Sequence, residues 1–137
     1  MKRFFTLLGI GLMSFYGQSQ TLDQLNTAST GSGWLVDFGS YQSVGQSFTP
    51  GITGTLAEVV ISLDATNGVY PIIAGNFTLS ILNGNGYGGT VVGTETFTIT
   101  GAEVSGDYSI PITSTISLTS GNSYTYIIDE ISGTGRI

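Results

Sequence analysis

Residues 75–81 read Gly-Asn-Phe-Thr-Leu-Ser-Ile, a stretch in which large apolar side chains alternate with small polar ones. Successive side chains of a β-strand point to opposite faces, so Phe77, Leu79 and Ile81 would share one face. The alternation predicts a strand that has one face in a hydrophobic core. The same period of two recurs along most of the chain, whereas helical spacing of apolar residues is essentially missing.

Seven further stretches are predicted as strands on this pattern and on the turn residues that bound them. They are residues 34–38, 44–49, 56–64, 96–100, 108–112, 116–118 and 123–129. Glycine, asparagine and serine gather between them, as in residues 83–86 and 120–122, which favours tight turns. About eight short strands separated by such turns predict an all-β protein, an antiparallel β-sandwich of jelly-roll-like topology. Pro111 cannot donate to a strand ladder, so we expect its strand to lie at a sheet edge or to end early.

The N-terminus has the pattern of a secretory signal. Lys2 and Arg3 precede an apolar run that extends from Phe4 to Phe15, as in signal peptides. The small residues Gly17 and Ser19 fit a cleavage that leaves Gln20 as the first residue. We expect residues 1–19 to be a removed signal peptide, and residues 20–137 to form one β-sandwich domain that is secreted or held at the cell surface.

Other forms of membrane attachment find little support in the sequence. An uncleaved N-terminal anchor is the alternative to a signal peptide, but a spanning helix needs about 20 apolar residues. No later segment is long and apolar enough to be a second span, so we expect no transmembrane segment after signal cleavage. The chain has no cysteine to carry a lipid, which excludes a lipoprotein.

Charge narrows the classes of partner. The chain has three basic and nine acidic residues, a net charge of −6. Removal of Lys2 and Arg3 would leave Arg136 against nine acidic residues, one minus nine, or −8. A surface this acidic cannot neutralise a run of phosphates, so we expect no nucleic-acid binding and no attachment to anionic lipid. Neutral polysaccharides, cell-surface proteins and divalent cations remain as partners.

A resemblance supports the same class. Residues 44–49, 56–63 and 75–81, and the closing run 116–126, resemble secreted β-sandwich modules of Bacteroidetes-like bacteria, of the choice-of-anchor type and the carbohydrate-binding jelly-roll type. The resemblance implies a non-catalytic module that is part of, or cut from, a larger extracellular system, and it carries over no site residues. Such modules continue with a further glycine-rich strand where this chain ends at residues 133–137. Either the domain is C-terminally truncated or that strand is dispensable.

Composition argues against catalysis. The chain has no histidine or cysteine, which removes the usual serine and cysteine triads and zinc sites built from these residues. The only lysine lies in the signal segment, so a Schiff base or a serine–lysine dyad is also excluded. Glu58 and Asp64 could share a strand face, but six residues of strand separate them by about 20 Å, too far for a glycosidase pair. We therefore predict a protein that is not an enzyme.

Carbohydrate binding is the most specific function that the residues suggest. Sugar rings stack on exposed aromatic side chains, while amide groups bind their hydroxyls. Tyr87 is the best candidate, because Asn83, Asn85 and several glycines surround it in a predicted turn. Tyr41 and Tyr70 also fall in or beside predicted loops. Trp34 has the same loop position, but a single tryptophan in a small sandwich is more often part of the core.

A structural calcium ion is a second open possibility, although no cofactor is required. Calcium takes six to eight oxygen ligands, often from loops. Asp64, Asn67, Asp107 and Asp129 lie near predicted strand ends and could contribute, but their spacing matches no known calcium loop. The sequence therefore leaves two classes of function: a module for carbohydrate binding or surface adhesion, and a structural spacer domain with no small-molecule ligand.

Overall fold

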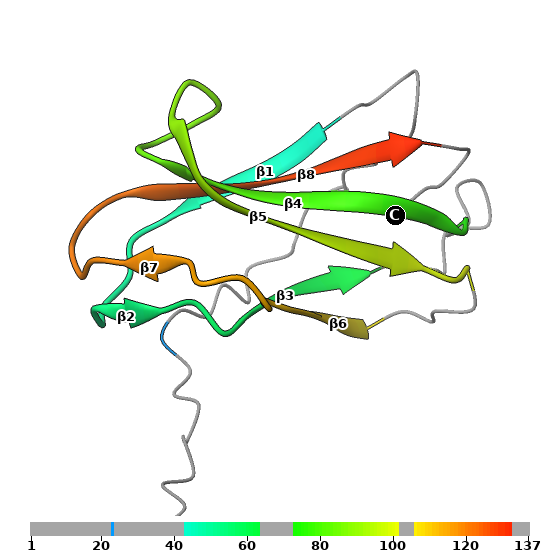
Figure 1. Cartoon of the computed structure of the whole chain (residues 1–137), viewed down its shortest axis with the longest axis horizontal. Helices are drawn as coiled ribbons and strands as arrows, with labels where there is room; N and C mark the ends of the chain where they lie inside the picture. Colours follow the sequence, from blue (N-terminus) through cyan, green and yellow to red (C-terminus); the bar gives the residue numbers. More distant parts are fainter. Residues whose placement is uncertain (1–22, 24–42, 64–72, 102–105, 133–137) are drawn as a thin grey trace, which may run out of the picture.

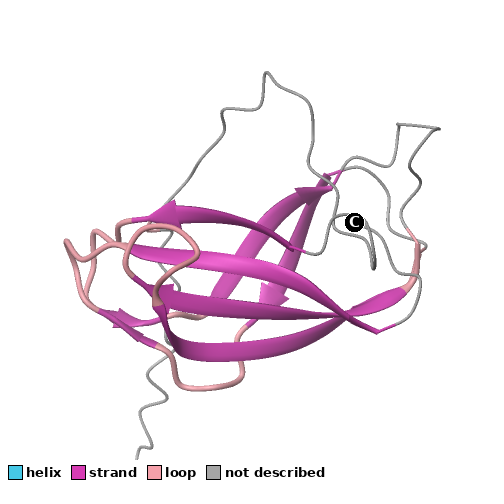
Figure 2. Ribbon diagram, turned by 90° about the horizontal axis from the view of Figure 1, so that it is seen from above, coloured by secondary structure: helices cyan, strands magenta, loops and turns pink. Residues whose placement is uncertain are grey.

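The computed structural model describes residue 23 and residues 43–63, 73–101 and 106–132, and every structural statement below concerns these residues. Their regular structure is entirely β, in eight strands (Figures 1 and 2). The strands are β1 (Ser43–Phe48), β2 (Gly54–Thr55), β3 (Glu58–Leu63), β4 (Gly75–Asn83), β5 (Thr90–Ile99), β6 (Gly106–Pro111), β7 (Ser117–Leu118) and β8 (Tyr124–Ser132). This part of the chain has no helix of the length and apolar character needed to cross a bilayer.

The strands form one four-stranded sheet and two strand pairs. The sheet has the order β1-β8-β4-β5, and the pairs are β2-β7 and β3-β6. Every pairing is antiparallel. In Figure 1 the two pairs lie below the four-stranded sheet. The prediction of an all-β, antiparallel protein of about eight strands is therefore confirmed for the described residues.

The core follows from the alternation in β4. Phe77, Leu79 and Ile81 are completely buried, and they face buried side chains of the strand pairs in one apolar cluster. The cluster of buried residues contains Leu63, Phe77, Leu79, Ile81, Ile99, Ile110, Ile116, Leu118, Tyr124 and Ile128. Full burial of such a side chain contributes about 1.5–3 kcal/mol, so this cluster is the main source of stability. We call the face of the sheet with Phe77 the inner face and the opposite one the outer face.

The two strand pairs form one interrupted ribbon. Gly54 lies opposite Leu118, and Glu58 lies opposite Pro111. Four residue steps on one side, 54 to 58, therefore match seven steps on the other, 111 to 118. Hydrogen bonds from the Leu56 amide to Ile116 and from the Ile112 amide to Ala57 bracket the extra residues. The three residues 113–115 thus form an insertion that leaves the ladder, and we call them the 113–115 insertion.

Asp23 ties a distant part of the chain to the turn after β1. Its carboxylate accepts hydrogen bonds from the Gly51 amide, at 3.0 and 3.1 Å, and from the Ile52 amide at 3.5 Å. The same turn is bound to the β7–β8 turn, because the Ser120 hydroxyl donates to the Gly51 carbonyl at 2.8 Å. A second bond between the turns runs from the Gly121 amide to the Pro50 carbonyl at 2.9 Å.

Each predicted strand within the described residues overlaps an observed one, but the bounds differ and the short strand β2 (Gly54–Thr55) was not predicted. The strand predicted at residues 96–100 is shorter than the observed strand, because β5 begins at Thr90 and pairs with β4 along its whole length. The strand at 108–112 ends at Pro111, as its proline predicts. The predicted strand 34–38, the signal peptide 1–19 and the C-terminal residues 133–137 lie outside the described residues.

Candidate functional site

The β4–β5 hairpin loop, residues 84–89, carries the best candidate site. Gly84 and Gly86 have φ angles of 100° and 83°, a region that side chains with a Cβ rarely adopt. The predicted turn at residues 83–86 is confirmed. We call residues 83–89 the hairpin tip.

Two hydroxyl groups hold the tip on the outer face of the sheet. The Gly86 amide donates to Thr125 Oγ1 at 2.8 Å and to Ser47 Oγ at 3.1 Å. Thr125 Oγ1 donates in turn to the Gly84 carbonyl at 2.9 Å and lies 2.9 Å from Ser47 Oγ. The Thr125 side chain is only 1% exposed. Hydrogen bonds to a buried hydroxyl fix a loop in one conformation, because breaking them would leave the Thr125 hydroxyl without a partner away from water.

The side chains of the tip face solvent. Asn83 and Asn85 are exposed, and Tyr87 is 58% exposed. Val91 and Val92, at the start of β5, are 58% and 42% exposed. The tip therefore presents an aromatic ring, two amide groups and an apolar border on a fixed loop.

The phenol of Tyr87 influences the pKa of Tyr126 through electrostatics. Burial raises the pKa of Tyr126, and the nearby Tyr87 raises it further. Tyr126 packs against the core cluster from β8, so it is not itself an exposed binding group. Its neutral phenol is the favoured form at every pH below its raised pKa, and the surroundings of the tip carry no added charge from it.

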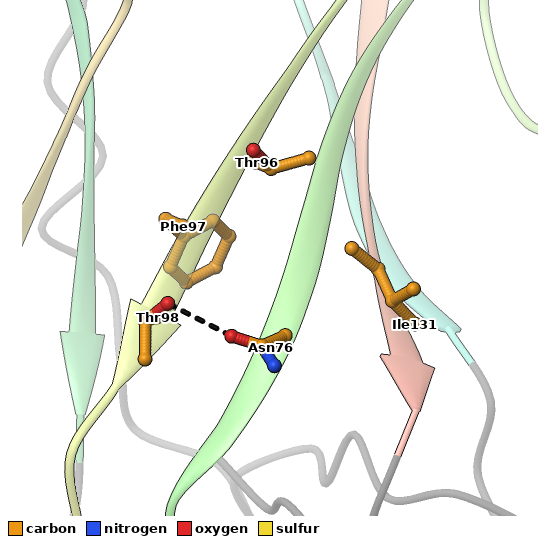
Figure 3. Close-up of a pocket in the computed structure, with 5 residues that line it drawn as sticks. All are labelled: Asn76, Thr96, Phe97, Thr98 and Ile131. Atoms are coloured by element: carbon orange, nitrogen blue, oxygen red, sulfur yellow. Dashed lines mark hydrogen bonds between the residues drawn. The ribbon is translucent and has the colours of Figure 1, made fainter.

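A shallow groove lies on strands β4, β5 and β8, away from the hairpin tip (Figure 3). It has a volume of about 290 Å³ and is lined by Asn76, Thr96, Phe97, Thr98 and Ile131. The Thr98 hydroxyl donates to Asn76 Oδ1 at 2.9 Å, which leaves the amide nitrogen of Asn76 as a donor at the surface. Asn76 is seven residues from Asn83, about 23 Å along an extended strand. The groove and the tip are thus two uncharged surfaces of mixed polar and apolar character, which lie at opposite ends of β4.

The described residues include three of the five predicted ligand-binding residues. Tyr87, Asn83 and Asn85 lie together on the hairpin tip. Tyr41 and Tyr70 lie outside the described residues, as does Trp34.

The predicted calcium ligands are divided in the same way. Asp107 is exposed in β6 and Asp129 is partly buried in β8, which belong to different sheets. Burial raises the pKa of Asp129, and a hydrogen bond from Ser43 opposes this shift. Asp64 and Asn67 lie outside the described residues. The described ranges contain no group of three or more histidine, cysteine, aspartate or glutamate side chains that could hold a metal ion. Calcium binding therefore stays a prediction.

Sequence reasoning missed the role of Glu95. Its carboxylate accepts the Thr113 amide at 2.9 Å, the Thr113 hydroxyl at 2.7 Å and the Ser114 amide at 3.1 Å. The Ser114 hydroxyl lies 3.1 Å from the same carboxylate. These hydrogen bonds, from the Thr113 side chain first and then from the backbone amides, hold the pKa of Glu95 below its usual value. Glu95 fixes the 113–115 insertion, and only the pairing of distant strands could have revealed this.

Comparison with protein-family models, with curated proteins and with solved structures found no match to this chain.

Proposed function

We propose that the protein is a non-catalytic extracellular module that binds carbohydrate through the hairpin tip. The observation that carries this proposal is the position of Tyr87, a 58% exposed aromatic ring on a loop fixed by hydrogen bonds to the buried Thr125. An exposed ring is a stacking surface for the apolar face of a sugar. Asn83 and Asn85 supply donors and acceptors for sugar hydroxyls beside it.

The rigidity of the tip supports the proposal. Binding costs free energy when a loop must be ordered, and a loop that is already fixed avoids this cost. The bonds of Gly84 and Gly86 to Thr125 hold the tip in one conformation without occupying the side chains of Tyr87, Asn83 or Asn85. The neutral groove at Asn76 and Thr98 offers further polar groups along the same strands.

The proposed function also concerns the fold of the module, its location and the class of its partner. We propose that the four-stranded sheet and the ribbon form a jelly-roll-like sandwich, for which the core cluster shared by both is the support. The basic and apolar N-terminus supports secretion or display at the cell surface. The acidic charge of the chain favours a neutral glycan or a protein of the cell surface over nucleic acid as partner.

A glycan array probed with the purified protein, with calcium and with chelator, tests the proposal. Wild type should bind a neutral glycan, Tyr87→Ala should lose this binding, and Tyr87→Phe should keep most of it because the ring remains. Val60→Ala is the matched control, since Val60 is 49% exposed but lies on β3 in the ribbon. Loss of binding in chelator would add a calcium requirement. A folded protein that binds no glycan would contradict the proposal and favour a structural spacer.

A further inference from the structure

Strand β5 is the last strand of the four-stranded sheet in the described part of the chain. A strand at a sheet edge exposes backbone groups that can pair with another chain, and proteins cover or interrupt such edges. β5 has ten residues, rich in threonine and valine, with Glu95 as its one charged residue. This composition favours further strand pairing.

Two side chains of the ribbon bind the outward backbone of β5. The Tyr108 hydroxyl donates to the Thr98 carbonyl at 3.0 Å. The Ser114 hydroxyl lies 3.2 Å from the Thr94 carbonyl and shares its hydrogen with Glu95. These carbonyls therefore point away from β4. Because backbone groups alternate in direction along a strand, the N–H and C=O of Thr96 between them also point outward.

Glu95 positions the second of these side chains. Its carboxylate binds the amides of Thr113 and Ser114 and the Thr113 hydroxyl, and so fixes the 113–115 insertion beside β5. Without this contact the insertion, which has left the ribbon ladder, would keep only the Ser114 bond to Thr94 on this side. The insertion and Tyr108 thus close the edge at two points on either side of Thr96.

We propose that the 113–115 insertion and Tyr108 form a cover that prevents β5 from pairing with β5 of a second copy of this chain, and that Glu95 is the residue that positions the insertion. The second copy is the fitting occupant because β5 is complementary to itself. In an antiparallel pair centred on Thr96, Thr94 lies opposite Thr98 of the other copy. Glu95 then lies opposite Phe97, so no two like charges are directly opposed.

The test removes the cover and measures the oligomeric state. Ser114→Ala with Tyr108→Phe removes both hydroxyl donors but keeps the Tyr108 ring, which packs 6.2 Å from Phe97. Light scattering after size-exclusion chromatography should show that wild type is monomeric and that the dimer fraction of the double variant grows with concentration. The apparent dimer Kd of the double variant should be lower than that of wild type by about tenfold or more. Glu95→Gln, and Ser114→Ala alone, should give a smaller shift in the same direction.

A third change identifies the interface. Thr96→Pro removes the outward N–H that a partner strand needs, and an edge strand tolerates proline at such a position. Added to the double variant, it should restore the monomer. Ser109→Ala is the matched control, because it removes a serine hydroxyl bonded to Glu58 within the β3–β6 pair, and it should stay monomeric.

Three results would overturn the proposal. The first is the finding that the double variant and the Ser114→Ala variant are both folded and both remain as monomeric as wild type. The second is association that Thr96→Pro does not reduce, which would place the interface elsewhere. The third is a wild-type dimer that Thr96→Pro dissociates, which would show that the edge is open in the native protein. Circular dichroism and thermal unfolding establish which variants are folded.

Discussion

The hairpin tip and the 113–115 insertion are both irregular segments held by side-chain hydrogen bonds, but their main anchors, Thr125 and Glu95, differ in kind. Thr125 holds the tip with a neutral hydroxyl that is 1% exposed. Glu95 holds the insertion with an ionised carboxylate that is partly exposed. A buried neutral anchor is costly to break and insensitive to pH, whereas a charged anchor near solvent is weaker and depends on pH. The four predictions below test this contrast, from the largest expected effect to the smallest.

Replacement of Thr125 by valine should have the largest effect. Valine keeps the shape of the side chain but leaves the Gly86 amide, the Gly84 carbonyl and the Ser47 hydroxyl without their buried partner. We expect a loss of about 3 kcal/mol in the free energy of unfolding, measured in urea at neutral and acid pH alike. Hydrogen exchange of the Gly86 amide should accelerate. A loss that changed with pH would contradict the neutral character of this anchor.

Alanine substitutions at Gly89 and Gly93 test how far the atoms around each glycine can move to make room for a Cβ. A Cβ on Gly89 would lie 2.0 Å from the backbone oxygen of Asn83, whereas one on Gly93 would meet the Ile116 side chain at 2.5 Å. Backbone cannot give way as a side chain can, so Gly89→Ala should cost about 2–3 kcal/mol and Gly93→Ala about 1 kcal/mol. Thermal unfolding of both variants checks the order. Equal losses would mean that Ile116 is as fixed as the backbone of the tip.

Replacement of Glu95 by glutamine should cost about 1 kcal/mol at neutral pH, since exposure weakens its hydrogen bonds. The pKa of Glu95 is lowered in the folded protein. Its contribution is therefore fully present above the unfolded value of 4.5 and is lost as the pH falls through the lowered folded value. Unfolding measured across this range should show wild type and variant converging in acid. A difference that persisted at the lowest pH would rule out the charge as its cause.

Replacement of Tyr87 by alanine should have the smallest effect on stability, within about 0.5 kcal/mol, because the ring is mostly exposed. The same change should abolish the proposed glycan binding. Urea unfolding and the array together separate the two readouts. A large loss of stability would show that Tyr87 is a packing residue and would weaken its assignment as a binding residue.

The strands could be predicted because a period of two is a local property of the sequence. Phe77, Leu79 and Ile81 are all completely buried, as their alternation with threonine and serine requires. Tyr124, in the predicted strand at residues 123–129, is also buried, at 5% exposed. In these stretches the alternation of neighbouring residues is enough to indicate one buried face, although Thr125 and Ile127 on the opposite face of β8 are buried as well.

The anchors could not be predicted because they join residues that are far apart in the chain. Gly86 and Thr125 are 39 positions apart, and Thr113 and Glu95 are 18 apart. Their contact depends on the register between β4, β8 and the ribbon, which no local pattern specifies. The residues of the tip were found from composition, whereas the residues that hold it, Ser47 and Thr125, look like ordinary polar strand positions.

The contact between Asp23 and the turn after β1 has a mechanical consequence. A pulling force applied to the chain ahead of residue 23 would act on Gly51 and Ile52 through this carboxylate as well as along the backbone. From Gly51 the tension continues through Ser120 into the turn before β8. β8 lies between β1 and β4 in the sheet. The side chain of a single aspartate thus couples the N-terminal side of the chain to two turns, one that follows the edge strand β1 and one that precedes the central strand β8.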